Sequence, residues 1–88
     1  SYPIAYAIAM RLLEKGPMKL DKLVRHVKRG KSTVCTHLSK LKLANLVRYE
    51  KEWRKTIYRI KYPGELKRFF RSCETLVERT TKRIKKDF

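Results

Sequence analysis

Several residue types and patterns are scarce in this sequence of 88 residues. Glutamine is absent, and no apolar run approaches the ~18 residues that a membrane-spanning helix needs. The N-terminal segment also lacks the charged and then apolar layout of a secretion signal. We therefore expect a cytoplasmic protein with no membrane partner. The high Lys and Arg content, the short loops and the lack of glutamine are typical of proteins from thermophiles.

Cysteine is scarce as well. Cys35 and Cys73 are too few and too far apart for a metal cluster or a secreted disulfide framework. Both are expected to pack as small hydrophobic residues. Because intracellular disulfides occur in thermophiles, a disulfide between two subunits through either cysteine stays open as an alternative.

The residue patterns of catalysis and of cofactor binding are missing. His26 and His37 have no nucleophile beside them in the sequence, and no glycine-rich phosphate loop occurs. Asp21, Glu50 and Glu52 form a poor cluster for the divalent metal of a nuclease. We therefore predict that the chain is not an enzyme and holds neither a metal nor a cofactor.

Acidic residues are few beside the basic ones. The chain has 24 Lys and Arg against eight Asp and Glu, which gives a formal net charge of +16. Such a charge favours nucleic acid over most other partners. The length predicts a single domain over residues 1–88, and a domain of this size buries little more than ~60% of the surface of its unfolded chain.

A helix of about three turns is predicted between Ser32 and Asn45. Val34, Leu38 and Leu41 follow one another at four- and three-residue steps, so one side of the helix is apolar and faces inward. Ser32 is expected to be the N-cap, and Asn45 to take the left-handed conformation that stops the helix.

The opposite side of this predicted helix is polar and basic. No acidic residue occurs between Arg25 and Arg48, whereas a helix that only faces solvent usually mixes Glu with Lys. The alternative is an ordinary amphipathic helix whose basic face is only solvated. For His37 the alternative to a DNA contact is a packed position at the surface. Hydroxyl, imidazole and ammonium groups reach the phosphates and base edges of a duplex. The residues expected to contact DNA here are Lys31, Ser32, Thr33, Thr36, His37 and Lys40.

Two helices are predicted before it. The first spans residues 1–15 and ends before Pro17, which cannot continue a helix. Residues 18–20 are too few for more than a stub of strand. A second helix begins with Asp21 as its N-cap, and a tight basic turn containing glycine joins it to the next helix. Residues 21–44 therefore have the outline of a helix-turn-helix.

A β-hairpin is predicted over residues 46–62, where Val47 and Tyr49 alternate with polar residues. Its tip has no glycine or asparagine, so we expect a turn that is longer or less regular than the two-residue type. Trp53 at the tip either reaches a nucleic acid or packs on the flank of the domain. The tip residues expected to contact the DNA backbone or the minor groove are Lys51, Arg54 and Lys55.

The last predicted element is a long helix over residues 65–88. Its apolar residues recur at three- and four-residue steps and offer more apolar area than a small three-helix core can cover. We therefore predict a symmetric homodimer in which this helix and the alanine-rich first helix pack against their copies. The expected interface residues are Ile4, Ile8, Leu66, Phe69, Phe70, Cys73, Leu76, Val77 and Ile84.

The order of the predicted elements resembles a winged helix-turn-helix, a mainly α fold with a small β-hairpin (α-α-α-β-β-α). Over about residues 9–61 the sequence is similar to the ArsR-type DNA-binding repressors, in an archaeal or thermophile-like form. The similar segments are Leu12-Leu13-x-x-Gly16-Pro17, Ser32-Thr33-Val34-Cys35-Thr36-His37-Leu38-x-x-Leu41, Leu46-Val47, Arg54 and Tyr58-Arg59-Ile60. The resemblance implies that residues 32–41 are the recognition helix.

The sequence departs from the metal-sensing members of this family. Those members carry a cysteine pair at the start of the second helix, where this chain has Lys19 and Asp21 nearby and no thiol. Other members bind zinc with a C-terminal helix that includes histidine, and residues 65–88 contain none. Metal sensing is therefore not implied for this chain.

Three functions fit these observations. The first is a dimeric, sequence-specific regulator of transcription that binds double-stranded DNA in the cytoplasm, at the nucleoid. The second is a chromatin-like architectural protein with little sequence preference, which the large positive charge favours because such binding depends mainly on phosphates. The third is a winged helix that binds another protein, which the fold permits. The hydroxyl and imidazole groups of the predicted recognition helix favour the first.

Overall fold

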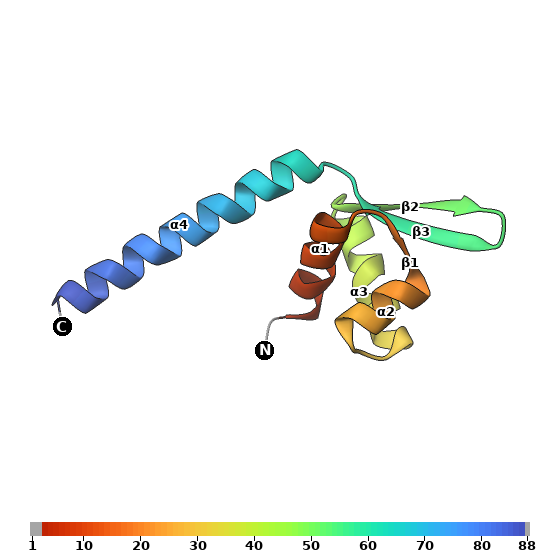
Figure 1. The fold of residues 1–88 in the computed structure, drawn as a ribbon, viewed down its shortest axis with the longest axis horizontal. Helices are drawn as coiled ribbons and strands as arrows, with labels where there is room; N and C mark the ends of the chain where they lie inside the picture. Colours follow the sequence, from red (N-terminus) through yellow and green to blue (C-terminus); the bar gives the residue numbers. More distant parts are fainter. Residues whose placement is uncertain (1–2, 88) are drawn as a thin grey trace.

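The computed structural model describes residues 3–87 and has the winged helix-turn-helix architecture that the sequence predicts (Figure 1). A two-residue strand joins the hairpin, so the sheet has three strands. The expected first and last residues of the terminal helices, 1 and 88, lie outside the described residues. In chain order the elements are α1 (Ile4–Lys15), β1 (Met18–Lys19), α2 (Leu20–Val27), α3 (Lys31–Leu43), β2 (Val47–Glu52), β3 (Lys55–Ile60) and α4 (Pro63–Asp87).

The core lies between α1, α2, α3 and the base of the sheet. Every buried side chain in the described part of the chain is apolar. Ile8 is 0% exposed and lies inside this core, so its expected place in a dimer interface is wrong: the monomer already covers it. The buried residues are Ile8, Ala9, Leu12, Met18, Leu23, Val34, Leu38, Leu41, Val47 and Ile60.

The N-caps of α2 and α3 each lie two residues before the predicted ones, at Lys19 and Gly30. Asp21 is not an N-cap but lies in the first turn of α2, because extended Lys19 leads from β1 directly into the helix. Likewise α3 begins at Lys31 after extended Gly30, so Ser32 is inside the helix and does not cap it. Neither helix start has a side-chain cap, which leaves its first backbone N–H groups without that partner.

The end of α3 agrees with the prediction. Asn45 has a φ of +64°, the left-handed conformation expected of the residue that stops the helix. The backbone N–H of Leu46 donates to the carbonyl of Leu41 at 3.0 Å, and the Asn45 side-chain oxygen accepts from the Lys61 ammonium at 2.6 Å. The first bond closes the end of the helix just before β2, and the second ties that end to the residue that follows β3.

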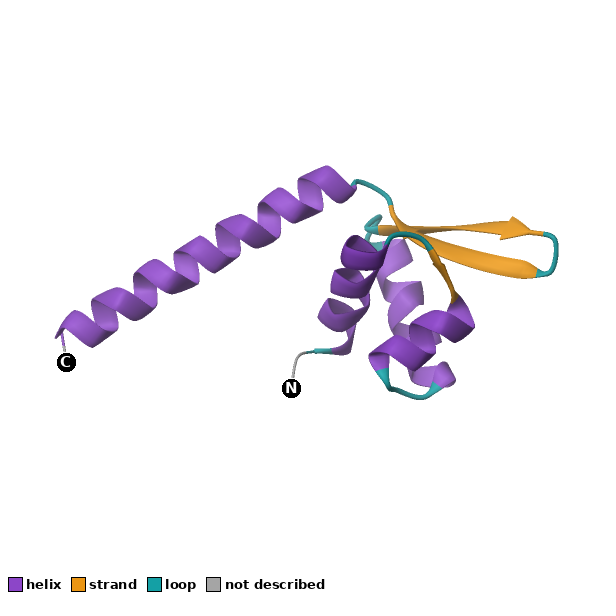
Figure 2. Ribbon diagram, in the orientation of Figure 1, coloured by secondary structure: helices purple, strands orange, loops and turns teal. Residues whose placement is uncertain are grey.

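The sheet is antiparallel, with the strand order β1-β3-β2 (Figure 2). Glu52 pairs with Lys55, so the wing, residues 47–60, turns through two residues. The expectation of a longer turn is therefore wrong. The turn closes without glycine because Trp53 itself takes a φ of +60°, a conformation that side chains other than glycine rarely adopt.

Helix α4 leaves the helical body in the direction opposite to the wing (Figure 1). Leu66 and Phe70 in its first turns pack against the core, and the rings of Tyr6 and Phe70 lie 5.3 Å apart. Beyond these contacts its apolar side chains are exposed: Phe69 54%, Leu76 64%, Val77 62% and Ile84 53%. No helix among the described residues is both long and apolar enough to cross a membrane.

The buried side of α3 provides a test of this packing. Leu38 is 2% exposed, so Leu38→Ala is expected to lower the free energy of unfolding by about 2–5 kcal/mol, through lost apolar burial and a cavity. Leu43 on the same helix is 88% exposed. Leu43→Ala is therefore expected to change the free energy of unfolding by less than about 0.5 kcal/mol. Chemical denaturation of both variants measures the difference, and equal losses would contradict the described orientation of α3.

Candidate nucleic-acid interface

The outward side of α3 is polar and carries no acid. Ser32, Thr33, Thr36 and Lys40 are exposed on it, while His37 is half-buried at its margin. The Thr36 hydroxyl donates to the carbonyl of Ser32 at 3.0 Å, so its proton is engaged and its oxygen remains an acceptor. This side therefore offers hydroxyl and ammonium groups to a partner that approaches the helix.

The tip of the wing is fully open to solvent. Lys51, Arg54 and Lys55 are exposed, and Trp53 is 98% exposed. The alternative in which Trp53 packs on the flank of the domain is therefore wrong. A large apolar side chain that is both exposed and held at a positive φ has no stabilising contact in the single chain, which makes it a candidate contact for a partner.

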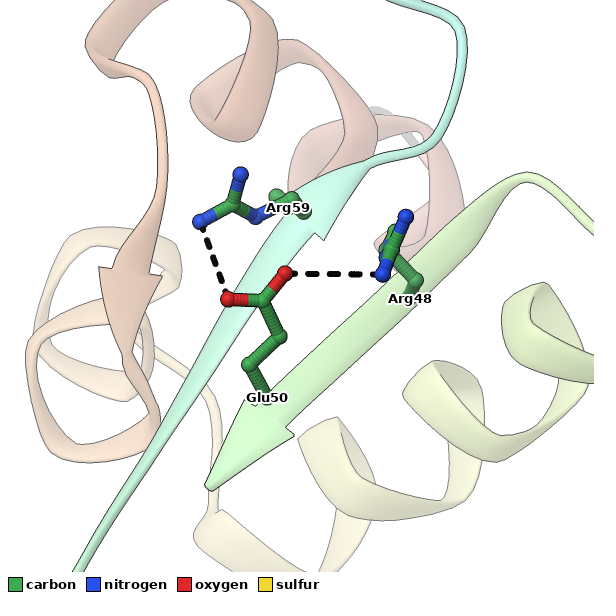
Figure 3. A network of polar contacts seen from close by, with 3 residues as sticks. All are labelled: Arg48, Glu50 and Arg59. Atoms are coloured by element: carbon green, nitrogen blue, oxygen red, sulfur yellow. Dashed lines mark hydrogen bonds and ion pairs between the residues drawn. The ribbon is translucent and has the colours of Figure 1, made fainter. Parts of the chain in front are cut away.

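A cluster of charged residues stiffens the outer face of the wing (Figure 3). Glu50 forms an ion pair with Arg48 at 3.5 Å and accepts a hydrogen bond from Arg59 on the neighbouring strand at 3.4 Å. The three side chains lie on the face of the hairpin opposite Val47 and Ile60, which are buried. Because the pairs are partly exposed, each contributes at most about 1 kcal/mol.

Cations from distant parts of the sequence meet where the starts of α2 and α3 face the wing. A hollow there is lined by residues of β1, α2, α3 and the wing, and Lys19, exposed in β1, is the member that sequence reasoning missed. The approach of the Lys55 ammonium lowers the pKa of Lys19, first through the contact between the two side chains and then through its charge. The lining residues are Lys19, Leu20, Asp21, Lys31, Arg54, Lys55, Thr56 and Tyr58.

A second groove lies between α3 and β2. The Lys42 ammonium lies 3.9 Å from the centre of the Tyr49 ring, and the Tyr49 and Tyr58 rings are 6.0 Å apart. The contact with the Lys42 side chain, and then its charge, lower the pKa of Tyr49, whereas burial raises the pKa of Tyr58. Lys42, Tyr49 and Lys51 all line this groove. Helical periodicity places Lys42 on α3, but only the fold shows that it faces the wing.

The structure brings some of the predicted residues together and separates others. Lys31 and the wing-tip residues Arg54 and Lys55 border one hollow, while Lys40 lies further along α3. Cys35 is half-buried, Cys73 is exposed, and both are free thiols. In the described part of the chain, no three His, Cys, Asp or Glu side chains gather as a metal site would require.

Comparison with known sequences gives one family. Residues 8–49 match the family model described as bacterial regulatory protein, arsR family. This match runs from within α1 to the first half of β2 and confirms the resemblance read from the sequence. The matched model is that of a family of bacterial regulatory proteins, and the match spans slightly less than half of the chain. A search of curated proteins finds no match.

Solved structures share the fold at low sequence identity. Rv0081 of Mycobacterium tuberculosis is 20% identical, with a TM-score of 0.78 over 96% of this chain and 84% of its own. BpsR of Bordetella bronchiseptica, whose DNA binding is regulated by 6-hydroxynicotinic acid, is 16% identical, with a TM-score of 0.72 over 91% of this chain. This chain spans 64% of the length of BpsR. The Zα domain of PKZ from Carassius auratus, solved in complex with Z-DNA, is 23% identical, with a TM-score of 0.61 over 65% of this chain and 90% of its own.

The exposed tryptophan of the wing tip yields a second test. Trp53→Gly removes no intrachain packing and places at a φ of +60° the residue that adopts it most readily. The free energy of unfolding is expected to stay the same or to rise by up to about 1 kcal/mol. Thermal denaturation measures this change, and a loss of more than about 1 kcal/mol would contradict the described exposure of the ring.

Proposed function

We propose that this chain, a winged helix whose residues 8–49 match the ArsR family model, is a DNA-binding regulator of transcription that acts as a homodimer on specific duplex sequences. The acid-free outer side of α3 carries this proposal, because it joins cations to hydroxyl groups that can read bases. The DNA binding described for BpsR and for the Zα domain of PKZ agrees with it.

In the proposed complex α3 lies in the major groove, and its N-terminal end is the end that enters the groove. Lys31, Ser32 and Thr33 at that end bind phosphates, where the positive end of the helix dipole adds to the attraction. Thr36, His37 and Lys40, further along the helix, face the base edges. The inward packing of Val34 and Leu38 holds α3 at a fixed angle to the body, so that these side chains enter the groove together.

The wing supplies contacts beside the groove. Arg54 and Lys55 brace the flanking backbone or reach into the minor groove, and the exposed Trp53 ring lies beside them. The wing turns through two residues, and the ion pairs of Glu50 brace its two strands, so its tip projects as a short, stiff element. A stiff tip loses little conformational freedom when it binds.

Dimerisation uses the stripe of α4, defined here as Phe69, Cys73, Leu76, Val77 and Ile84. These side chains repeat at the spacing of helices packed along a seam, and they are exposed in the single chain. Ile4 of α1 is partly exposed and is the second element of the proposed interface. A two-fold axis then predicts a pseudo-palindromic site with half-sites about 34 Å apart, one turn of the duplex.

Architectural binding with little sequence preference is the second candidate function, which the net charge of +16 favours.

A titration of the protein against its own upstream DNA and a scrambled duplex, over a series of salt concentrations, distinguishes the sequence-specific regulator from the architectural protein. A preference of ~10³ or more for one sequence supports the regulator. Equal binding that falls steeply with salt supports the architectural protein, and no binding at low salt contradicts both.

Two lysines test the division of roles between helix and wing. Lys40→Ala is expected to reduce the preference for the specific duplex, because it removes a base contact. Lys55→Ala is expected to weaken all duplexes alike and to lower the slope of log K against log salt by about one, because it removes a phosphate contact. The same titration measures both, and identical effects of the two variants on both duplexes would contradict these roles.

A matched pair of variants tests the proposed dimer interface on α4. Leu76→Glu places a charge on the exposed stripe and is expected to convert the dimer to a monomer, with weaker binding to a two-half-site duplex. Thr75→Glu adds the same charge one residue away, on the opposite side of α4, and is expected to remain dimeric. Sedimentation equilibrium measures the mass of each. A wild-type monomer, or a dimeric Leu76→Glu protein, would show that this stripe is not the interface.

A further inference from the structure

We infer that the hollow between the starts of α2 and α3 and the tip of the wing is a phosphate-binding site that takes one phosphodiester of the DNA backbone. This inference rests on the proposed DNA binding and adds to it a site and a residue, Lys19, that neither the sequence nor the family resemblance indicates. The hollow is bordered by four cations from three separate segments of the chain: Lys19, Lys31, Arg54 and Lys55.

The arrangement of these cations is fixed by the backbone. Lys19 pairs with Ile57 across the sheet, which holds β1 against the part of β3 that follows the wing tip. Lys31 opens α3, and the hollow therefore joins the recognition helix to the wing. The side chains of Thr56 and Tyr58 also line it and bring hydroxyl groups that can donate to an anion. A tetrahedral, multiply charged group suits such a set of donors.

The closeness of Lys19 and Lys55 indicates that the ligand of the hollow is an anion. The Lys55 ammonium lowers the pKa of Lys19, so the fold holds like charges close enough to repel. Among the residues that line the hollow, Asp21 is the only acid. An anion placed between the ammonium groups replaces this repulsion by attraction to both. The uncapped first turns of α2 and α3 border the same space, and their N–H groups add to the attraction.

Asp21 has a separate role in this site. Its carboxylate lies 3.9 Å from the Lys31 ammonium, and both side chains are largely exposed, at 83% and 66%. In the free protein Asp21 thus provides the negative charge that a phosphate would bring. A bound phosphodiester competes with this carboxylate for Lys31 and is repelled by it, so Asp21 weakens the attraction of the hollow for DNA.

The inference gives two variants with effects of opposite sign. Lys19→Ala is expected to weaken duplex binding about three- to tenfold and to lower the salt slope by about one, for specific and scrambled duplexes alike. Asp21→Asn is expected to strengthen binding of both duplexes about threefold, since it removes the competing charge at constant size. Lys22→Ala is the matched control: Lys22 is exposed, follows Asp21 in α2 and does not line the hollow.

A second measurement distinguishes the source of the phosphate. Amide chemical shifts of the 15N-labelled wild-type protein are compared in chloride and in inorganic phosphate at constant ionic strength. Duplex binding that depends on Lys19, with or without shifts at residues 19–21 and 31, supports a phosphodiester site. Shifts in phosphate combined with unchanged duplex binding by Lys19→Ala would mean that the hollow takes free phosphate, and would overturn the assignment to DNA.

The remaining outcomes separate this inference from the proposed function. If Lys19→Ala and Lys22→Ala lose the same affinity for the duplex, only the overall charge matters. That result overturns the proposed phosphate site and leaves the proposed DNA binding intact. Weaker binding by Asp21→Asn also overturns that site. A wild-type protein that binds no duplex contradicts the proposed function itself, and the comparison in inorganic phosphate then reports on the hollow alone.

Discussion

The packing of one side of α3 against α1, α2 and the sheet is the constraint on which the rest of the structure depends. Val34 and Leu38, at 0% and 2% exposure, fix the rotation of α3 about its axis. That rotation decides which side chains face outward, and on α3 these include no acid. The exposed basic side of α3 is therefore a consequence of burying its apolar side, and both follow from one helical repeat in the sequence.

Electrostatics then favours a polyanion as the partner of this surface. Within the described residues four ion pairs occur, against 24 Lys and Arg in the chain. Glu50 neutralises cations on the outer face of the wing, and Asp21 meets Lys31 at the edge of the hollow. The cations that remain near α3 and the wing tip have little to offset their repulsion. A duplex removes that repulsion and releases its own counterions on binding.

Local patterns predicted much of this fold, and tertiary pairing accounts for the rest. The 3.6-residue period of α3 and the left-handed stop at Asn45 follow from neighbouring residues, and the structure confirms both. Apolar residues lie on several sides of α1, so its sequence could not show that Ile8 faces the core and not a partner. The contribution of Lys19 depends on the pairing of β1 with β3, which joins residues about forty positions apart. The two-residue turn at Trp53 runs against residue preference, which is why the sequence predicted a longer one.

The proposed DNA-binding surface consists of α3 and the wing. Its most direct test is to map backbone amide shifts of the 15N-labelled protein as a short duplex is added at low salt. The largest changes are expected in residues 31–40 and 51–55, with the exposed stripe of α4 unaffected. Changes concentrated on α4, or spread evenly over the surface, would contradict it.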